Sequence, residues 1–207
     1  MLPTPMLKET ASQTAGPYLH IGMMPQAVGF DIRSRERLNV LAGPNAQGQR
    51  IRLEGTIHDG EGVLVRDAMV EIWQANTHGK YDHPGDRQDL ALDPAFKGWG
   101  RAVSDFETGL WWFDTVKPGK VVGRHGRIMA PHINVAIFAR GINLGLNTRI
   151  YFADEEEANA ADPVLGLIEQ TPRRATLLAR REERDGRPVY RFDIRLQGEH
   201  ETVFLDV

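Results

Sequence analysis

Apolar and polar residues alternate along several short stretches of this chain, which is the pattern of strands that bury one face. Residues 51–57 alternate in this way, and an Asp-Gly turn at 59–60 separates them from a second strand pattern at residues 68–73. We expect these two strands to pair as a hairpin. Further strands are predicted at residues 100–103 and 110–113, on either side of a Thr-Gly turn.

The C-terminal part of the chain combines strand patterns with one helical stretch. Residues 149–152 have the pattern of a short strand, and the Glu- and Ala-rich residues 154–161 predict a short helix that follows an Asp cap. Residues 175–180 and 189–196 flank another Asp-Gly turn and predict a second hairpin. The four tryptophans fall in strand patterns, where large aromatic rings are expected in the core.

The fold class follows from how these elements are spaced. Residues 132–139 are nearly continuously apolar, which predicts a central strand buried on both faces. Residues 74–99 have no sustained period and predict a long irregular segment, while residues 1–50, rich in Pro, Gly and Gln, predict an N-terminal arm. Short strands divided by Gly and Pro turns favour an all-β fold, a β-sandwich in which residues 1–207 form a single domain.

Composition narrows the classes of protein to consider. The chain has 207 residues, of which 41% are hydrophobic and 26% charged, as in ordinary globular proteins that bury a core. Its net charge of −3 gives no reason to expect binding to nucleic acid or to an anionic membrane. Cysteine is absent, which excludes disulfides and thiolate metal sites. Prolines interrupt the N-terminal stretch where a signal peptide would be apolar, so we expect a cytoplasmic location.

A motif associated with metal binding lies in the predicted central strand. Residues 131–135 are Pro-His-Ile-Asn-Val, and side chains two positions apart in a strand point to the same side. His132 and Asn134 are therefore expected to face one pocket, as paired histidines do in many iron and zinc sites. An asparagine is a poor replacement for the second imidazole.

The stretches around this motif resemble the intradiol ring-cleavage dioxygenases, which open catechols between their two hydroxyls with non-haem Fe(III). The resemblance implies the β-sandwich of that family, with mixed topology and long irregular loops. It is carried in order by residues 53–57, 70–76, 79–81, 113–119 and 131–133.

In catalytic members of that family two tyrosines and two histidines hold the iron, a ligand set that suits a hard trivalent cation. Transferred to this sequence, the first tyrosine falls on Tyr81 and the first histidine on His132. The second tyrosine falls on Val121, which has no donor atom, and the second histidine falls on Asn134. We therefore expect no metal in this chain and interpret Tyr81 and His132 as packed relics of a lost site.

One branch of the family is built from two homologous chains, of which only one keeps the iron, and this sequence resembles the iron-free chain. The resemblance implies a hetero-oligomer with a homologous partner chain that holds Fe(III). It also implies a small aromatic substrate, 3,4-dihydroxybenzoate, which O2 cleaves to 3-carboxy-cis,cis-muconate. The chain alone is then predicted to be inactive.

Two features are candidates for contact with that substrate. Residues 13–18 resemble the arm that walls the partner's substrate cavity in this branch, which makes Thr14, Ala15, Gly16 and Pro17 candidate substrate-binding residues. The alternative is an ordinary turn. Arg140 is the other candidate, because an arginine that ends a buried strand needs an anionic or carbonyl partner. That partner is either a substrate carboxylate or a carboxylate across the subunit interface.

Two alternative functions remain open from the sequence. The first is a self-sufficient catechol or hydroxyquinol dioxygenase, which Val121 and Asn134 disfavour. The second is a non-enzymatic β-sandwich binding module, which would account for the missing ligands but not for the arm motif or Arg140.

Overall fold

A mixed, eight-stranded sheet dominates the computed structural model, which describes residues 13–32, 37–143 and 145–206. The strand order is β4-β3-β8-β9-β10-β11-β1-β5, and the outer strands β4 and β5 contact each other, so that the sheet folds back on itself. The strands are β1 (Arg50–Gly55), β3 (Met69–Gln74), β4 (Trp99–Val103), β5 (Trp111–Val116), β8 (His132–Phe138), β9 (Leu146–Phe152), β10 (Leu178–Arg184) and β11 (Arg187–Arg191).

Shorter elements complete the fold. Two small sheets join β2 to β12 in parallel and β6 to β7 in antiparallel orientation. Their bounds are β2 (Ile57–His58), β12 (Ile194–Arg195), β6 (Val121–Val122) and β7 (Ile128–Met129). The helices are α1 (Leu19–Met23), α2 (Glu156–Ala161) and α3 (Thr171–Arg174), and the 3-10 turns are η1 (Pro25–Val28), η2 (Arg124–Gly126), η3 (Leu165–Leu167) and η4 (Ala175–Leu177).

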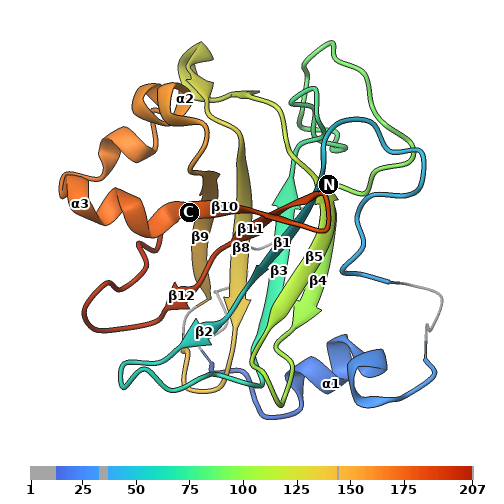
Figure 1. The fold of residues 1–207 in the computed structure, drawn as a ribbon, viewed down its shortest axis with the longest axis vertical. Coiled ribbons are helices and arrows are strands. Elements are labelled where there is room, and N and C mark those ends of the chain that lie inside the picture. The colour runs from blue at the N-terminus through green and yellow to red at the C-terminus, as the bar shows by residue number, and fades with distance from the viewer. Residues whose placement is uncertain (1–12, 33–36, 144, 207) are drawn as a thin grey trace, which may run out of the picture.

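The sheet is mixed because two of its strand pairs, β9 with β10 and β1 with β11, are parallel while the others are antiparallel. Figure 1 shows α2 and α3 on the side of β9, and α1 at the opposite end of the molecule from α2. The described part of the chain contains no helix that is long and apolar enough to cross a membrane.

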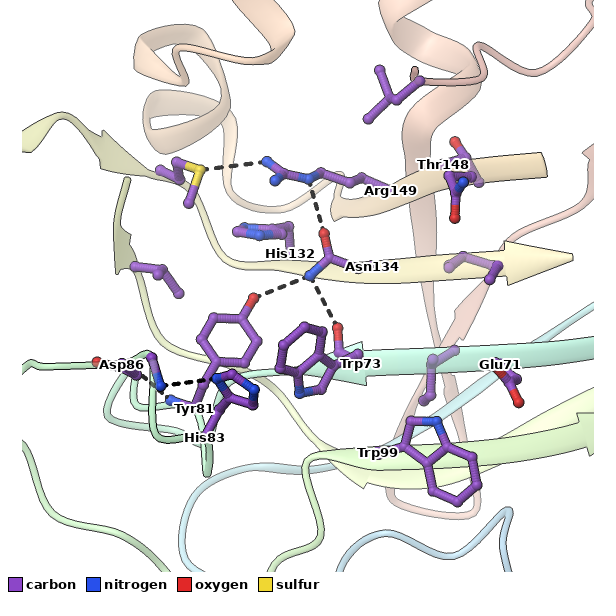
Figure 2. A pocket seen from close by; sticks show the side chains of 18 of the residues that line it. Glu71, Trp73, Tyr81, His83, Asp86, Trp99, His132, Asn134, Thr148 and Arg149 are labelled. Atoms are coloured by element: carbon purple, nitrogen blue, oxygen red, sulfur yellow. Dashed lines mark hydrogen bonds between the residues drawn. The ribbon is translucent and has the colours of Figure 1, made fainter. Parts of the chain in front are cut away.

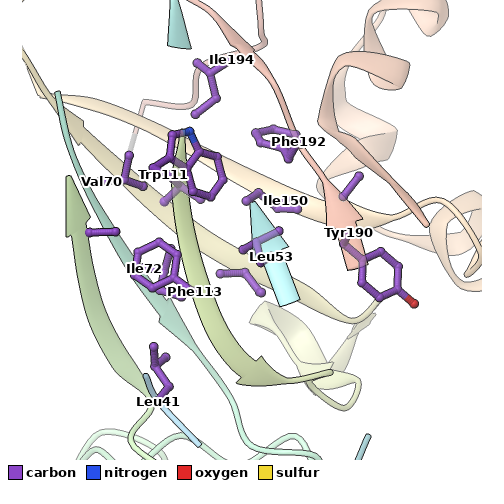
Figure 3. Packing of buried hydrophobic residues seen from close by; sticks show 14 of the residues in the cluster. Leu41, Leu53, Val70, Ile72, Trp111, Phe113, Ile150, Tyr190, Phe192 and Ile194 are labelled. Carbon is purple, nitrogen blue, oxygen red and sulfur yellow. The ribbon is translucent and has the colours of Figure 1, made fainter. Parts of the chain in front are cut away.

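The core lies between the two halves of the folded sheet. Leu53, Phe113 and Tyr190 come from one half, Ile72 and Ile150 from the other, and all of them are fully or almost fully buried (Figure 3). Side chains from both halves fill one continuous cluster, as in a β-sandwich. The predicted all-β sandwich of mixed topology is therefore confirmed.

The first predicted hairpin is wrong, although the second is confirmed. β1 pairs with β5 and β11, whereas β3 pairs with β4 and β8. The turn after β2 does form, but the chain returns through residues 63–65 instead of 68–73. The second hairpin consists of the antiparallel strands β10 and β11, which are joined by the turn residues Asp185 and Gly186. Both turn residues have positive φ, which suits a two-residue hairpin turn.

Three local predictions need correction. Beyond the buried His132, β8 is fully buried on only one face, since residues 133, 135 and 137 are buried in the core while the side chain of Asn134 borders a pocket. α2 begins after Glu155, and its cap makes no side-chain hydrogen bond, so the predicted Asp cap is absent. Of the four tryptophans only Trp111 is in the core cluster, while Trp73 and Trp99 are 42% and 41% exposed.

Candidate functional site

A cavity of about 1030 Å³ covers the outer face of the sheet over β4, β3, β8 and β9. Its floor is a row of residues in register across these strands, in which Trp99 lies opposite Trp73, Trp73 opposite Asn134, and Asn134 opposite Arg149. Figure 2 shows this row with Tyr81 and His132 beside it. The predicted common face of His132 and Asn134 is confirmed, because both border this cavity.

Tyr81 reaches the cavity from a loop whose path depends on two glycines. Gly79 has a φ of +82°, and a Cβ there would lie 2.0 Å from the carbonyl oxygen of Lys120. A Cβ on Gly119 would lie 2.5 Å from the carbonyl oxygen of Thr77, so only glycine allows these two loops to cross so closely. The Asp86 carboxylate then holds the loop by accepting the Tyr81 backbone N–H at 2.8 Å.

A chain of hydrogen bonds joins three side chains of the cavity (Figure 2). Arg149 Nε donates to Asn134 Oδ1 at 3.0 Å, and Asn134 Nδ2 donates to the Tyr81 hydroxyl oxygen at 3.1 Å. Arg149 also contacts Met129 Sδ at 3.4 Å. Burial raises the pKa of the Tyr81 phenol above its ordinary value despite the Asn134 hydrogen bond and the nearby Arg149 charge. The phenol is therefore protonated at neutral pH.

His132 is an almost fully buried imidazole at the edge of the same cavity. Its Nδ1 lies 2.7 Å from the carbonyl oxygen of Ala130, so Nδ1 carries the proton. Burial, with a smaller contribution from the Arg149 charge, lowers the pKa of His132 to about 4. The neutral ring then presents Nε2 as an acceptor, and that atom has no hydrogen-bond partner among the described residues.

The arm motif and Arg140 meet at another place in the structure. The Thr14 hydroxyl accepts the Gly141 backbone N–H at 2.9 Å and donates to the Ala15 carbonyl at 3.3 Å. Arg140 forms an ion pair with Asp67 of its own chain, and its side chain is still 62% exposed. The sequence predicted that the partner of Arg140 would be a substrate carboxylate or a carboxylate across an interface. It did not predict the ion pair with Asp67 of the same chain.

The remaining arm residues are open to solvent. Gly16 and Pro17 are exposed, and, its two neighbours in the chain apart, no atom of the described residues lies within 4 Å of a Cβ built on Gly16. At about 3.3 Å per strand residue, Arg140 lies about 26 Å along the chain direction from His132, at the other end of β8. The arm motif therefore does not border this chain's own cavity.

Comparison with known proteins assigns the family. Residues 32–198 match the profile described as Dioxygenase. The protocatechuate 3,4-dioxygenase alpha chain of Pseudomonas putida is 52% identical over 205 residues, covering 99% of this chain and 100% of that protein. The chain belongs to the intradiol dioxygenase family.

Two further matches within the intradiol dioxygenases have lower sequence identity to this chain. The protocatechuate 3,4-dioxygenase beta chain of Burkholderia cepacia is 36% identical and covers 79% of this chain and 71% of its own length. The structure of hydroxyquinol 1,2-dioxygenase from Pseudomonas putida DLL-E4 superposes with a TM-score of 0.58 at 20% identity, covering 86% of this chain and 72% of that chain. This structure supports the fold alone.

The residues at the metal position of the intradiol dioxygenase family do not fit Fe(III) here. Val121 is buried in the wall of the cavity on β6 and has no donor atom. Asn134 offers only a neutral amide, whose oxygen already accepts from Arg149. The fixed guanidinium charge of Arg149 beside this position would also repel a trivalent cation. No reaction step of this chain is therefore assigned to a metal in its own cavity.

Sequence reasoning missed three residues of this region. Arg149 was placed in a strand without a role, and Trp73 and Trp99 were expected in the core. Knowledge of the strand pairing would have identified these residues. Arg149, for example, borders the cavity because β9 pairs with β8 in a register that places it opposite Asn134. Asp67, the partner of Arg140, follows no local pattern and required the three-dimensional structure.

Proposed function

We propose that this chain is the non-catalytic α subunit of protocatechuate 3,4-dioxygenase and works in a hetero-oligomer with a homologous β chain. The observation that carries the proposal is the combination of a full-length match to an α chain with a cavity that cannot hold Fe(III). The lower identity and shorter coverage of the β chain match supports the same assignment.

The proposed reaction is the cleavage of 3,4-dihydroxybenzoate by O2 to 3-carboxy-cis,cis-muconate. Both atoms of O2 enter the product, and the ring bond between the two hydroxyl-bearing carbons breaks. Fe(III) in the β chain would supply the Lewis acidity that activates the catecholate. The cytoplasmic location expected from the sequence stays a prediction.

This chain would contribute shape and charge to the partner's substrate cavity. Thr14, Ala15, Gly16 and Pro17 are exposed or half-exposed at the end of β8 where Arg140 also lies, so one surface carries all of the proposed contacts. Asp67 fixes one side of the Arg140 guanidinium, and the remaining N–H groups can receive the substrate carboxylate. An ion pair that positions an arginine in this way reduces the side-chain entropy lost on binding.

A reconstitution experiment tests the assignment. The chain is purified alone and together with a homologous β chain from the same organism, and bound iron and dioxygenase activity are measured for each. We expect iron and activity only in the complex. Stoichiometric iron in the isolated chain, or ring cleavage by the isolated chain, would contradict the proposal and favour a self-sufficient dioxygenase.

Kinetics of the complex test the role of Arg140. Arg140→Ala is expected to raise KM for 3,4-dihydroxybenzoate about tenfold or more, because a charge-assisted hydrogen bond to the carboxylate is lost, while iron content is unchanged. Asp67→Asn should raise KM less than Arg140→Ala does, since it removes the ion pair that positions the guanidinium but keeps the guanidinium itself. Arg180→Ala, at an exposed position on β10, is the matched control. Loss of assembly in Arg140→Ala, with normal KM in the remaining complex, would assign Arg140 to the interface instead.

A further inference from the structure

The cavity over β3, β8 and β9 contains polar groups that can still form hydrogen bonds or ion pairs with a ligand. Its volume of about 1030 Å³ is at the upper end of the range of small-molecule sites. Three groups, Arg149, His132 and Tyr81, border it together (Figure 2). The chemistry of a ligand follows from what each group can still donate or accept.

Arg149 supplies positive charge that no carboxylate of the described residues neutralises through an ion pair. Its hydrogen-bond contacts are to neutral groups, namely Asn134 Oδ1, Met129 Sδ and the Tyr151 side chain. Thioether sulfur is a weak acceptor, so a ligand oxyanion would bind the guanidinium more strongly than Met129 does.

The acidic residues that border the cavity do not cancel this charge. Glu71 forms an ion pair with Arg101, and Asp86 forms one with Lys80 at 3.3 Å. Arg87 adds a further cation at an exposed position of the lining. The electrostatic field of the cavity therefore favours an anion.

His132 and Tyr81 add an acceptor and a donor. Nε2 of the neutral His132 is buried without a partner among the described residues, and a buried polar atom of this kind is costly unless a ligand or water satisfies it. The Tyr81 oxygen accepts from Asn134, which leaves the phenolic proton free to be donated into the cavity. A ligand hydroxyl can satisfy both groups, because a hydroxyl donates and accepts.

The cavity also has aromatic walls beside these polar groups, on the β3 and β4 side, and they favour a flat, apolar ligand body. Trp73 and Trp99 border the cavity and are 42% and 41% exposed, and Val122 is also exposed there. Indole rings of this exposure provide faces and edges on which an aromatic ring can pack.

We propose that the metal-free cavity binds an aromatic carboxylate that carries a ring hydroxyl, with the carboxylate on Arg149 and the hydroxyl on His132 and Tyr81. The ligand stays intact there, because Val121 and the Asn134 amide do not provide the donors that a metal would need to activate it. The chain thus has a second, non-catalytic site for the class of compound that the proposed enzyme cleaves. This inference rests on the chain's own residues and requires neither iron nor activity.

Ligand comparison on the wild-type chain is the first test. The isolated full-length chain is titrated with 4-hydroxybenzoate, which cannot be cleaved, and binding is followed by tryptophan fluorescence and by calorimetry. The probe 4-hydroxybenzyl alcohol, which lacks the anion, should bind about 10- to 100-fold more weakly. Benzoate, which lacks the hydroxyl, should bind about three- to tenfold more weakly. Equal affinity for the acid and the alcohol would overturn the proposal, and so would a lack of saturable binding.

Substitution of the charged group is the second test. Arg149→Gln should lower the affinity for 4-hydroxybenzoate about 10- to 100-fold and leave the affinity for 4-hydroxybenzyl alcohol unchanged. Arg180→Gln removes an exposed charge outside the cavity and should change neither value. Unchanged 4-hydroxybenzoate binding in Arg149→Gln would refute the assigned role of Arg149.

In the α/β complex the same substitution should lower the stoichiometry from two ligands per α/β pair to one. A failure of the proposed function would instead appear as iron or activity in the isolated chain.

Discussion

At the scale of one residue, His132 lies where the family resemblance places a metal ligand, and its surroundings affect the stability of the protein. Its imidazole is buried, neutral and tied by Nδ1 to the carbonyl oxygen of Ala130. The lowered pKa of about 4 means that the folded chain resists protonating this ring. In the unfolded chain the same ring has an ordinary pKa of about 6.5.

The stability of the protein is therefore expected to decrease as pH falls. Because the folded pKa lies below the unfolded one, the contribution of His132 is complete above about pH 6.5 and is lost as pH falls from there towards 4. Between pH 7 and pH 5 the loss is about 2 kcal/mol. Urea unfolding of the wild type and of His132→Gln at both pH values measures it. The prediction fails if the pH dependence of unfolding is the same in the two proteins.

At the scale of elements, the buried Asp162 carboxylate joins the start of β8 to the segments beside it. It is 2% exposed and accepts the backbone N–H groups of Ala130, Val164 and Leu165 at 2.8 to 2.9 Å. It also accepts the Tyr151 hydroxyl at 3.1 Å. One side chain thus satisfies four donors, which lie in β9, at the start of η3 and before β8.

Removing this carboxylate should destabilise the fold as a whole. Asp162→Ala leaves several buried donors unsatisfied and is expected to lower the free energy of unfolding by about 3 kcal/mol. Glu199→Ala removes an exposed carboxylate, 90% accessible, and should change stability by no more than about 0.5 kcal/mol. Chemical denaturation compares the two, and equal effects would exclude the anchoring role.

The neighbouring positions of Asn134 and Arg149 on β8 and β9 lead to a prediction about iron binding. Val121→Tyr with Asn134→His restores the donor types of the family, yet Arg149 remains next to position 134 across the strand pair. We expect this double variant to bind Fe(III) poorly and to bind it better when Arg149→Gln is added. Iron content and visible tyrosinate absorption measure the outcome. Tight iron binding by the double variant alone would show that Arg149 does not oppose the metal.

At the scale of the whole molecule, Gly16 and Pro17 of the arm are exposed to solvent, which leaves them available for the proposed contact with the partner chain. The methyl group added by Gly16→Ala meets no non-neighbouring atom within 4 Å in the part of the chain that the structure describes, so the free energy of unfolding should be unchanged within about 0.5 kcal/mol. In the proposed complex the added methyl group should raise KM or weaken assembly, because Gly16 would lie against the partner. Gly166→Ala, at another exposed glycine with free space, is the control. Normal kinetics and assembly of Gly16→Ala would remove the arm from the site.

Local patterns predicted the parts of the fold whose partners are close in the sequence. The β10–β11 hairpin was found because its turn residues and both strands lie within one short segment. The partners of β1 could not be found in this way, because alternation shows that a strand has a buried face and not which distant strand lies beside it. The missing donors Val121 and Asn134 were visible in the sequence, whereas the cation that lies beside them depends on β9 being paired with β8.

β8 also restricts how the chain can change in evolution. The strand is hydrogen-bonded to β3 and β9 along its length, with Asn134 near one end and Arg140 just beyond the other. Single substitutions in the cavity leave this pairing in place. Insertion of one residue between them would turn the following side chains to the opposite face of the sheet and carry Arg140 away from Asp67. The residue types that border the cavity can therefore vary, but the strand that carries them has to keep its length.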